Sequence, residues 1–341
     1  MKRALVYYKV FLTWVGGGRY LPLLFIAELQ KTCEVTLALC IESDIRKAAE
    51  ITGIPIDVSK LNVVLVKPKN KFLARIDDIL PFIRIWKLKK LARNADVCIS
   101  TVNMIDFGKP AHHFVYLLKM FGDNAFIDFA THAPPKKGLA LFKRKARTFL
   151  AETILRPMLG IRSTRKIIAD SREHIYPTSQ YVDGIMREFY GNFNSTIFYP
   201  PTAFEINLKD VERVPNRVNY IGRISKEKRI EQIISIVEHA RESSGVDFSL
   251  FIAGQMEDSP YGRMLQRIAK DKPWIRFVGQ VLNEDKERFL LSGCYAIHAE
   301  RDETFGIAIT EYLKAGCVPI VPDEGGTVEI VDSPELTYHT V

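Results

Sequence analysis

The chain has 341 residues, of which 47% are hydrophobic and 26% charged, a balance typical of a soluble protein with two domains. No stretch reaches 18 apolar residues without a charge, which argues against a membrane-spanning helix. The five cysteines form no CxxC pair and no metal-binding spacing, which indicates reduced thiols in a cytosolic protein. Residues 1–200 carry 31 Lys and Arg against 17 Asp and Glu, whereas residues 201–341 carry 17 against 23. A basic half and an acidic half favour two domains with different partners.

Short β-branched runs alternate with amphipathic segments through the first 200 residues. The first run, ALVYYKV, is interpreted as a strand rather than a signal peptide, because no small-residue cleavage site follows it. The later predicted strands are EVTLALC, NVVLV, ADVCIS, AFIDFA and KIIAD. Nearly all-apolar strands that alternate with helices predict a parallel sheet covered on both faces.

The second half repeats this alternation after a break at Pro200-Pro201, which cannot continue a strand or a helix. Its predicted strands are RVNYIG, FSLFIAG, IRFVG, YAIHA and CVPIV. The expected fold class is α/β, with two doubly wound, Rossmann-like parallel-sheet domains, residues 1–200 and 201–341, facing a cleft. Such sheets bind ligands beyond the carboxyl ends of their strands, so the loops after the strands are the candidate sites.

The loop after the first strand, WVGGGRYLP, contains Gly17 and Gly18. Glycines before a helix let backbone N–H groups approach an anion at the helix N-terminus. The loop matches neither the Rossmann fingerprint, since position 21 is Leu, nor a P-loop, since no GKS or GKT follows. A tight turn without a ligand is the alternative.

A cationic loop opens the second half, where Gly222 and Arg223 follow the strand RVNYIG and Lys228 comes five residues later. Both cations precede a long helix whose N-terminus is already positive, so they add little to helix stability. They suit a site that holds a diphosphate without a metal ion. A solvated basic loop is the alternative.

Two glutamates frame the segment ETFGIAITE, with Glu303 in a loop and Glu311 inside the following helix. Phe305 and Gly306 lie between them at the predicted helix start, where Gly306 permits close approach of a ligand to the backbone. A charge among apolar helix residues needs a partner, and the vicinal hydroxyls of a ribose provide one. An ordinary surface glutamate is the alternative for Glu311.

As a set, these motifs resemble the family-4 retaining glycosyltransferases of the GT-B fold. The signature of that family is two glutamates separated by seven residues, with Phe-Gly between them, and an Arg…Lys pair on an earlier loop. Glu303 and Glu311 match the first motif, and Arg223 and Lys228 match the second. The first half is similar through its glycine loop, the segment DFATHAPP and the segment from IADSREH to FYPP, in which Asp170 replaces the usual Asn. Within the family, IHAERDETFG and THAPP look most like mannosyltransferases that act on lipid-linked oligosaccharides.

The resemblance implies retaining transfer of a sugar, best assigned as mannose, from a GDP- or UDP-sugar to a hydroxyl of a lipid-linked glycan. Residues 1–200 would bind the acceptor and residues 201–341 the donor, without a metal ion or cofactor. Members of the family usually continue past the last Gly-Gly segment, so the chain is expected to be a short or a truncated member.

The resemblance also implies the role of each residue. The catalytic set is Glu303, which holds the donor sugar, His132 from the acceptor side, and Arg223 and Lys228, which stabilise the leaving diphosphate. A hydrogen-bonded loop histidine is the alternative for His132. The contacts to the nucleotide sugar are assigned to Gly17, Gly18, Gly222, Arg223, Lys228, Gly254, Gln280, Val281, Glu303, Phe305, Gly306 and Glu311. The remaining histidines, His112, His113 and His298, are interpreted as structural.

Residues 136–166 contain ten Lys and Arg and one acid, interspersed with large apolar residues. A basic, partly amphipathic segment suits an anionic membrane surface, and a core helix with a solvated basic face is the alternative. No nucleic-acid recognition motif accompanies it. The expected location is therefore cytoplasmic, peripheral on the cytoplasmic face of a membrane.

Two other functions remain open from the sequence alone. One is a nucleotide-sugar epimerase or hydrolase of the same fold, which would need a dedicated acid/base set. The other is a non-catalytic polyanion-binding protein, for which Glu303 would be dispensable.

Overall fold

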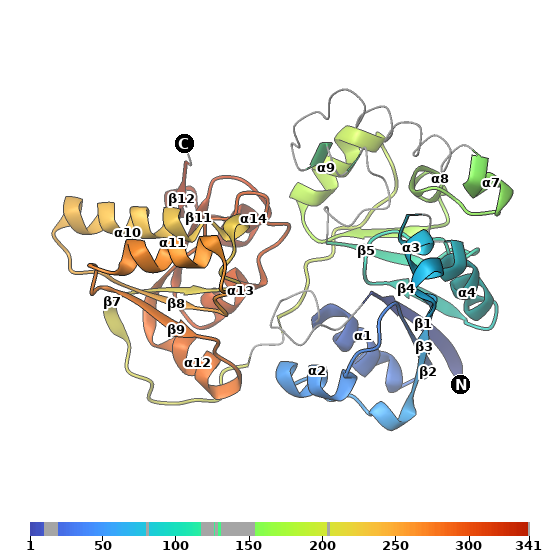
Figure 1. Ribbon diagram of the computed structural model, residues 1–341, viewed down its shortest axis with the longest axis horizontal. Coiled ribbons are helices and arrows are strands. Elements are labelled where there is room, and N and C mark those ends of the chain that lie inside the picture. Colours follow the sequence, from blue (N-terminus) through green and yellow to red (C-terminus); the bar gives the residue numbers. More distant parts are fainter. Residues whose placement is uncertain are drawn as a thin grey trace. The chain divides into compact units, whose positions relative to one another are not determined.

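The computed structural model describes residues 1–9, 20–79, 82–116, 126, 129–130, 154–202 and 205–339. The chain divides mainly between Pro200 and Pro201 into two compact units (Figure 1). Unit 1 contains nearly all of residues 1–200, and unit 2 contains residues 201–341.

Unit 1 is built on a six-stranded sheet in the order β3-β2-β1-β4-β5-β6, in which all pairs are parallel. Its strands are β1 (Lys2–Tyr8), β2 (Cys33–Leu39), β3 (Leu61–Leu65), β4 (Val97–Ser100), β5 (His112–Val115) and β6 (His174–Pro177). Its helices are α1 (Tyr20–Gln30), α2 (Ile45–Thr52), α3 (Lys71–Ile79), α4 (Phe82–Ala92), α7 (Arg156–Met158), α8 (Thr164–Ile168) and α9 (Gln180–Tyr190). The strand order reverses between β1 and β4, so the loop after β1 leaves the sheet at its switch point.

Unit 2 repeats the design with the order β12-β11-β10-β7-β8-β9, again parallel throughout. Its strands are β7 (Val214–Ile221), β8 (Ser249–Ala253), β9 (Ile275–Gly279), β10 (Gly293–Ile297), β11 (Val318–Pro322) and β12 (Thr337–Tyr338). Its helices are α10 (Ile230–Ser244), α11 (Pro260–Ala269), α12 (Asn283–Leu291), α13 (Ile307–Lys314) and α14 (Thr327–Val331). The predicted α/β class with two doubly wound parallel sheets is confirmed.

Helices cover both faces of the unit 2 sheet (Figure 1). On one face, Ile233 of α10 and Leu265 of α11 pack with Ile252 of β8, and all three are fully buried. On the other face, Leu290 and Ile309, from α12 and α13, pack with residues of β8 and β10. Burial of a large aliphatic side chain stabilises by about 1.5–3 kcal/mol, which explains why the strands are apolar on both sides.

Two of the predicted strands of unit 1 are wrong. The run KIIAD lies largely in α8, because Ser163 caps that helix by accepting a hydrogen bond from the Lys166 N–H (3.3 Å). In the run AFIDFA, residues 126 and 129–130 are helical. The sheet instead uses β5 and β6, whose histidine and tyrosine side chains hide the strand pattern. His112 stacks on His174 across this pair, with ring centroids 4.7 Å apart.

Candidate active site

The strand order of unit 2 brings two of the predicted loops together. β7 and β10 are neighbours at the point where the strand order reverses, and both run in the same direction. The loop after β7 carries Lys228, and the loop after β10 carries Glu303. Because parallel strands end at the same edge of the sheet, residues 75 positions apart meet at a place where α/β sheets bind ligands.

Lys228 lies between two carboxylates at this edge. Its Nζ is 2.7 Å from Oε2 of Glu303, and it forms a second ion pair with Glu300. His298, the first residue after β10, places Nε2 3.7 Å from the same Glu303 oxygen. The Lys228 and Glu303 side chains retain about a fifth of their exposure (18% and 21%), so the pair remains accessible to a ligand.

Burial and charge set the ionisation of these groups. Burial disfavours the charged form of Lys228, but the carboxylates of Glu303 and Glu300 outweigh it and raise the pKa of Lys228. Burial likewise opposes ionisation of Glu303, but Lys228 and then His298 hold its pKa well below the usual range. For Glu300 burial dominates and raises the pKa. Burial, followed by the Lys228 charge, lowers the pKa of His298 to about 4. At neutral pH the centre of the site is therefore an ionised Glu303, a charged Lys228 and a neutral histidine.

The sequence analysis missed His298 and Glu300 as members of this site. Both lie within five residues of Glu303, and the His-x-Glu spacing at the end of the predicted strand YAIHA was an available signal. Ligand atoms of His298, Glu300 and Glu303 all lie within 4.8 Å of one another, a geometry that could hold a metal ion. The Lys228 ammonium already contacts both carboxylates, and this charge disfavours a divalent cation in the same space.

Arg223 differs from Lys228, although the sequence suggested an equivalent pair. Its side chain is exposed and forms no ion pair with any residue that the structure describes. Its carbonyl oxygen accepts a hydrogen bond from the Tyr220 hydroxyl (3.1 Å), which fixes the backbone of the loop. Arg223 can therefore bind an anionic ligand directly. Lys228 would first have to give up a carboxylate partner.

Glycines let the loops after β7 and β8 pack backbone against backbone. A Cβ on Gly254 would lie 1.9 Å from the carbonyl oxygen of Gly222, so no other residue fits there without moving the loop. Gly254 also donates its N–H to the carbonyl of Gly279, the last residue of β9 (2.8 Å). Of the predicted base-pocket residues on the next loop, Gln280 is exposed, whereas Val281 packs partly against the core.

Helix α13 begins at Ile307, directly after Gly306, as predicted. Gly306 has a left-handed backbone (φ 99°), and a Cβ there would lie 2.7 Å from Cγ2 of Thr327. Phe305 is buried, so its side chain anchors the loop while the backbone remains at the helix N-terminus. Gly326 donates its N–H to the carbonyl of Glu303 (2.7 Å), which joins the loops after β10 and β11.

Glu311 is not a surface glutamate, because only 4% of it is exposed. Its partner is Lys286 of α12, whose Nζ is 2.5 Å from Oε1. The expectation that a carboxylate at this position needs a partner was right. In the structure that partner is Lys286 of the same unit, rather than a ribose. A ribose would therefore have to share or replace the contact with Lys286.

Three of the predicted site residues, Gly17, Gly18 and His132, lie outside the described residues. Residues 136–153 of the basic segment also lie outside them. In the described remainder of that segment, Arg156 is buried and Arg162 is neutralised by acidic residues of unit 1. These two cations therefore contact other residues of unit 1. They are not available to a membrane surface, contrary to the expectation from the sequence.

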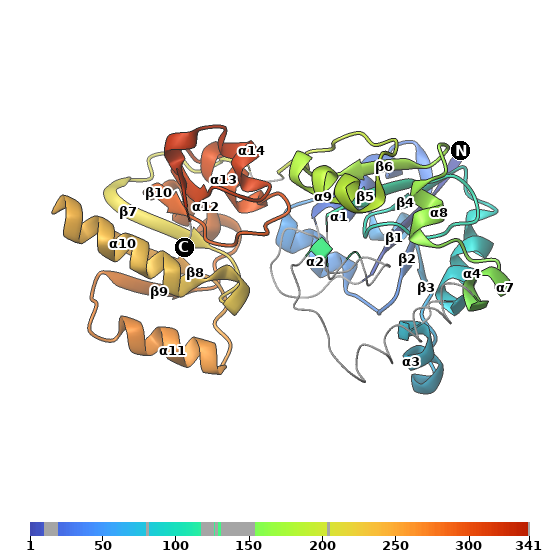
Figure 2. The ribbon, with the colours of Figure 1, turned by 90° about the horizontal axis from the view of Figure 1, so that it is seen from above.

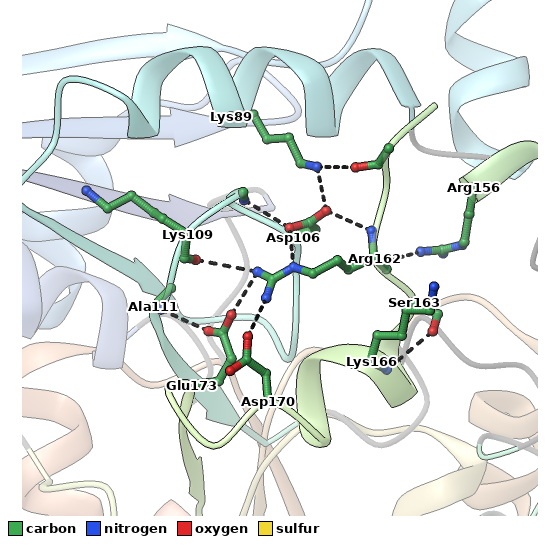
Figure 3. Close-up of polar contacts among 12 residues, drawn as sticks. Lys89, Asp106, Lys109, Ala111, Arg156, Arg162, Ser163, Lys166, Asp170 and Glu173 are labelled. Atoms are coloured by element: carbon green, nitrogen blue, oxygen red, sulfur yellow. Dashed lines mark hydrogen bonds and ion pairs between the residues drawn. The ribbon is translucent and has the colours of Figure 1, made fainter. Parts of the chain in front are cut away.

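Arg162 belongs to a buried polar network in unit 1 (Figure 3). Its guanidinium binds Asp106 (2.9 Å), Asp170 (3.2 Å) and Glu173 (2.7 Å). Glu173 directly precedes β6, and its carboxylate also accepts the N–H of Ala111, which directly precedes β5 (2.8 Å). The network therefore lies at the amino ends of the strands, opposite the ligand-binding edge, and Asp170 is part of this structural support.

Residues 205–339 match the model of the family described as "Glycosyl transferases group 1". The GDP-Man:Man(3)GlcNAc(2)-PP-Dol alpha-1,2-mannosyltransferase of Candida glabrata is 26% identical over 163 residues, covering 43% of this chain and 32% of the relative. The enzyme of the same name from Eremothecium gossypii is 25% identical over 145 residues, 39% of this chain and 25% of the relative. The matches thus span about a third or less of the curated relatives.

Solved glycosyltransferases share the fold of the whole chain. The pneumococcal O-GlcNAc transferase GtfA, in complex with UDP and GlcNAc, has a TM-score of 0.64 at 10% identity, covering 100% of this chain and 88% of that structure. WaaG, involved in lipopolysaccharide biosynthesis, has a TM-score of 0.59 at 14% identity, covering 96% and 83%. The protein therefore has the GT-B fold. Residues 205–339, in unit 2, match the glycosyl transferases group 1 model, and this match confirms the resemblance to glycosyltransferases for unit 2.

Proposed function

We propose that the protein is a glycosyltransferase that moves a sugar from a nucleoside diphosphate to a hydroxyl of a glycan. The observation that carries the proposal is the Lys228–Glu303 pair at the switch point of a glycosyl transferases group 1 domain. The pair puts a cation suited to a diphosphate beside a carboxylate suited to the sugar that the diphosphate releases.

The chemistry follows from how charge moves in the reaction. When the bond between the sugar carbon and the diphosphate oxygen breaks, the electron pair leaves with the diphosphate and the sugar ring becomes positive. Lys228 and the exposed Arg223 stabilise the leaving group, and the ionised Glu303 faces the positive ring. In the proposal these two cations take the place of a metal ion, and the product keeps the configuration of the donor.

The finer proposal is a GDP-mannose donor and a lipid-linked acceptor at the cytoplasmic face of a membrane. It is supported by the names of the two relatives, which contain GDP-Man and PP-Dol, and by the basic segment 136–166. Among the described residues, no helix is long and apolar enough to cross a membrane.

A hydrolase of nucleotide sugars is the second candidate. Glu300, whose pKa is raised, lies beside the ionised Glu303, and such a pair resembles a general acid with a charged partner. Release of free sugar in the presence of a glycan acceptor would favour the hydrolase, and a glycan lengthened by one sugar would favour the transferase.

The test of the donor site is a thermal-shift panel of GDP, UDP and their sugars, with and without excess EDTA. Nucleoside diphosphates should raise the melting temperature of the protein, and EDTA should leave the shift intact. Arg223→Ala should reduce the shift without lowering the melting temperature of the free protein, because this side chain forms no ion pair with the described residues. A shift that disappears in EDTA would assign the diphosphate to a metal ion and overturn the metal-independent mechanism.

A further inference from the structure

Helices α3 and α4 of unit 1 expose large apolar side chains that the fold does not use. Phe72 is 70% exposed, Leu73 39% and Trp86 63%. Trp86 lies on the outer side of α4, since its neighbours Ile85 and Leu88 are buried on the inner side. Large exposed apolar side chains on two helices that are joined by hydrogen bonds indicate a surface that binds a partner.

The two helices are held together as a fixed hairpin. Asp77, near the end of α3, is fully buried and accepts the N–H groups of Ile83 (3.0 Å) and Arg84 (3.1 Å) in the first turn of α4. The Arg84 guanidinium returns a hydrogen bond to the carbonyl of Asp77 (3.3 Å). At the other end of α4, Lys89 binds Asp106 (2.7 Å), which fixes the helix on unit 1. The two helices are therefore already ordered, so binding of a partner to this surface would cost little conformational entropy.

Cations surround the apolar side chains. Residues 67–93 contain nine Lys and Arg and two Asp, of which Asp77 is buried in the hairpin. The exposed cations are Lys69, Lys71, Lys90 and Arg93. Lys90 follows Trp86 by four residues, so the two share a face of α4, and the Lys90 Nζ lies 5.9 Å from the Trp86 ring centroid. Arg93 directly follows the end of this helix.

The combination selects one kind of occupant. A second copy of the same surface would bring like charges together, which disfavours self-association. A lipid surface offers negative headgroups to the cations and an interfacial layer to the aromatic side chains, where Trp is enriched. We propose that helices α3 and α4, which are labelled in Figure 2, dock unit 1 on an anionic lipid bilayer. Their exposed side chains Phe72, Leu73 and Trp86 would enter the headgroup layer. The inference rests on the proposed function for its partner and adds a second membrane-contacting surface to segment 136–166.

The test is co-sedimentation of the full chain with vesicles of phosphatidylcholine alone or with phosphatidylserine. The wild type should bind only the anionic vesicles, and less tightly at high salt. Replacing Lys69, Lys71, Lys90 and Arg93 by Ser should weaken binding by roughly 100-fold or more, since each cation contributes about fivefold. Phe72→Ser with Trp86→Ser should weaken binding at every salt concentration, and Trp86→Phe should retain most of it.

Matched variants separate this surface from general effects. Arg267→Ser with Lys270→Ser removes two exposed cations of unit 2, and Val246→Ser removes an exposed apolar side chain there; both should bind like the wild type. The GDP-induced thermal shift of each hairpin variant, measured without vesicles, checks that the fold and the donor site are intact. A hairpin variant that keeps this shift but loses the vesicles supports the docking surface even if no transfer activity is found.

Two results would overturn the proposal. One is full vesicle binding by the hairpin variants, with the loss confined to Lys143→Ser, Arg144→Ser, Lys145→Ser and Arg147→Ser, which would assign the membrane to 136–166 alone. The other is a wild-type dimer that Phe72→Ser with Trp86→Ser converts to a monomer, which would make the hairpin an interface between copies.

Discussion

Glu303 and Glu311 match the same sequence motif, but their surroundings give them different roles. Glu303 is paired with Lys228 at the ligand-binding edge and keeps a fifth of its side chain exposed, whereas Glu311 is buried against Lys286. The first carboxylate can therefore reach a sugar directly. The second acts on a ligand only by giving up part of an existing ion pair.

Substitution of the two glutamates should separate turnover from binding. Glu303→Gln removes the charge that faces the transition state, so kcat should fall by about 100-fold or more while GDP binds as well as before or better, because Lys228 loses a competitor. Glu311→Ala leaves the Lys286 charge unpaired and should weaken nucleotide binding by about 1–3 kcal/mol. Kinetics and isothermal titration on both variants, with Glu335→Gln as an exposed control, measure the difference. Small and equal effects of the two substitutions would mean that neither glutamate contributes to turnover or to nucleotide binding.

His298 should make the stability of unit 2 depend on pH. Its pKa is lowered from 6.5 to about 4 by burial and by Lys228, so the folded state keeps it neutral. Between pH 6.5 and 4 the unfolded chain binds the proton and the folded protein does not, so the free energy of unfolding must fall as pH falls. The loss between pH 7 and pH 5 should be about 2 kcal/mol, and His298→Gln should remove it. Urea unfolding at the two pH values measures the slope, and an equal slope in the variant would contradict the assignment.

Sequence reasoning at this scale found the residues whose chemistry is unusual for their position. It assigned Glu303 and the cationic loop to one site, and the structure brings Glu303 and Lys228 together because the ends of β7 and β10 are neighbours. It missed His298 and Glu300, because His298 was interpreted as a structural residue of the predicted strand YAIHA and the His-x-Glu spacing was not used. It also treated Arg223 and Lys228 as equivalent, since only the structure reveals that Lys228 has carboxylate partners.

At the scale of elements, close packing of the loops after β7 and β8 positions the site. Gly254→Ala would drive a methyl group into the Gly222 carbonyl and should displace the loop that carries Arg223 and Lys228. The expected loss is more than about 3 kcal/mol of unfolding free energy, with weaker GDP binding. Gly279→Ala is the matched control, because its left-handed backbone is strained by a side chain but its Cβ meets nothing within 4 Å. It should cost only about 1 kcal/mol and leave GDP affinity unchanged, and similar losses in both variants would contradict the packing argument.

The strands that were predicted correctly are those with apolar residues on both faces. In unit 2, all five predicted strands correspond to observed strands, β7 to β11. The errors occur where a short apolar run is compatible with either a helix or a strand. The run KIIAD lies largely in α8, because Ser163 caps the N-terminus of that helix. β5 and β6 were missed because their stacked histidine and tyrosine side chains replace the usual β-branched pattern.

At the scale of the whole molecule, charge is divided between the two units. Residues 1–200 carry 14 more cationic than acidic residues, and residues 201–341 carry 6 more acidic than cationic residues. An anionic bilayer would attract the first unit and repel the second. In the proposed function, this division fits binding of the membrane and the acceptor by unit 1 and binding of the soluble donor by unit 2.

Removal of cations from segment 136–166 tests this division. Replacing Lys143, Arg144, Lys145 and Arg147 by Ser should weaken binding to anionic vesicles by orders of magnitude, because each cation contributes about 1 kcal/mol near the surface. Transfer to a short, water-soluble acceptor should survive, since the donor site is built from unit 2. Transfer to an acceptor embedded in vesicles should fall with the binding, and salt should no longer weaken it further. Equal loss of both activities would mean that the segment supports the acceptor site itself, and unchanged vesicle binding would leave a soluble acceptor as the better explanation.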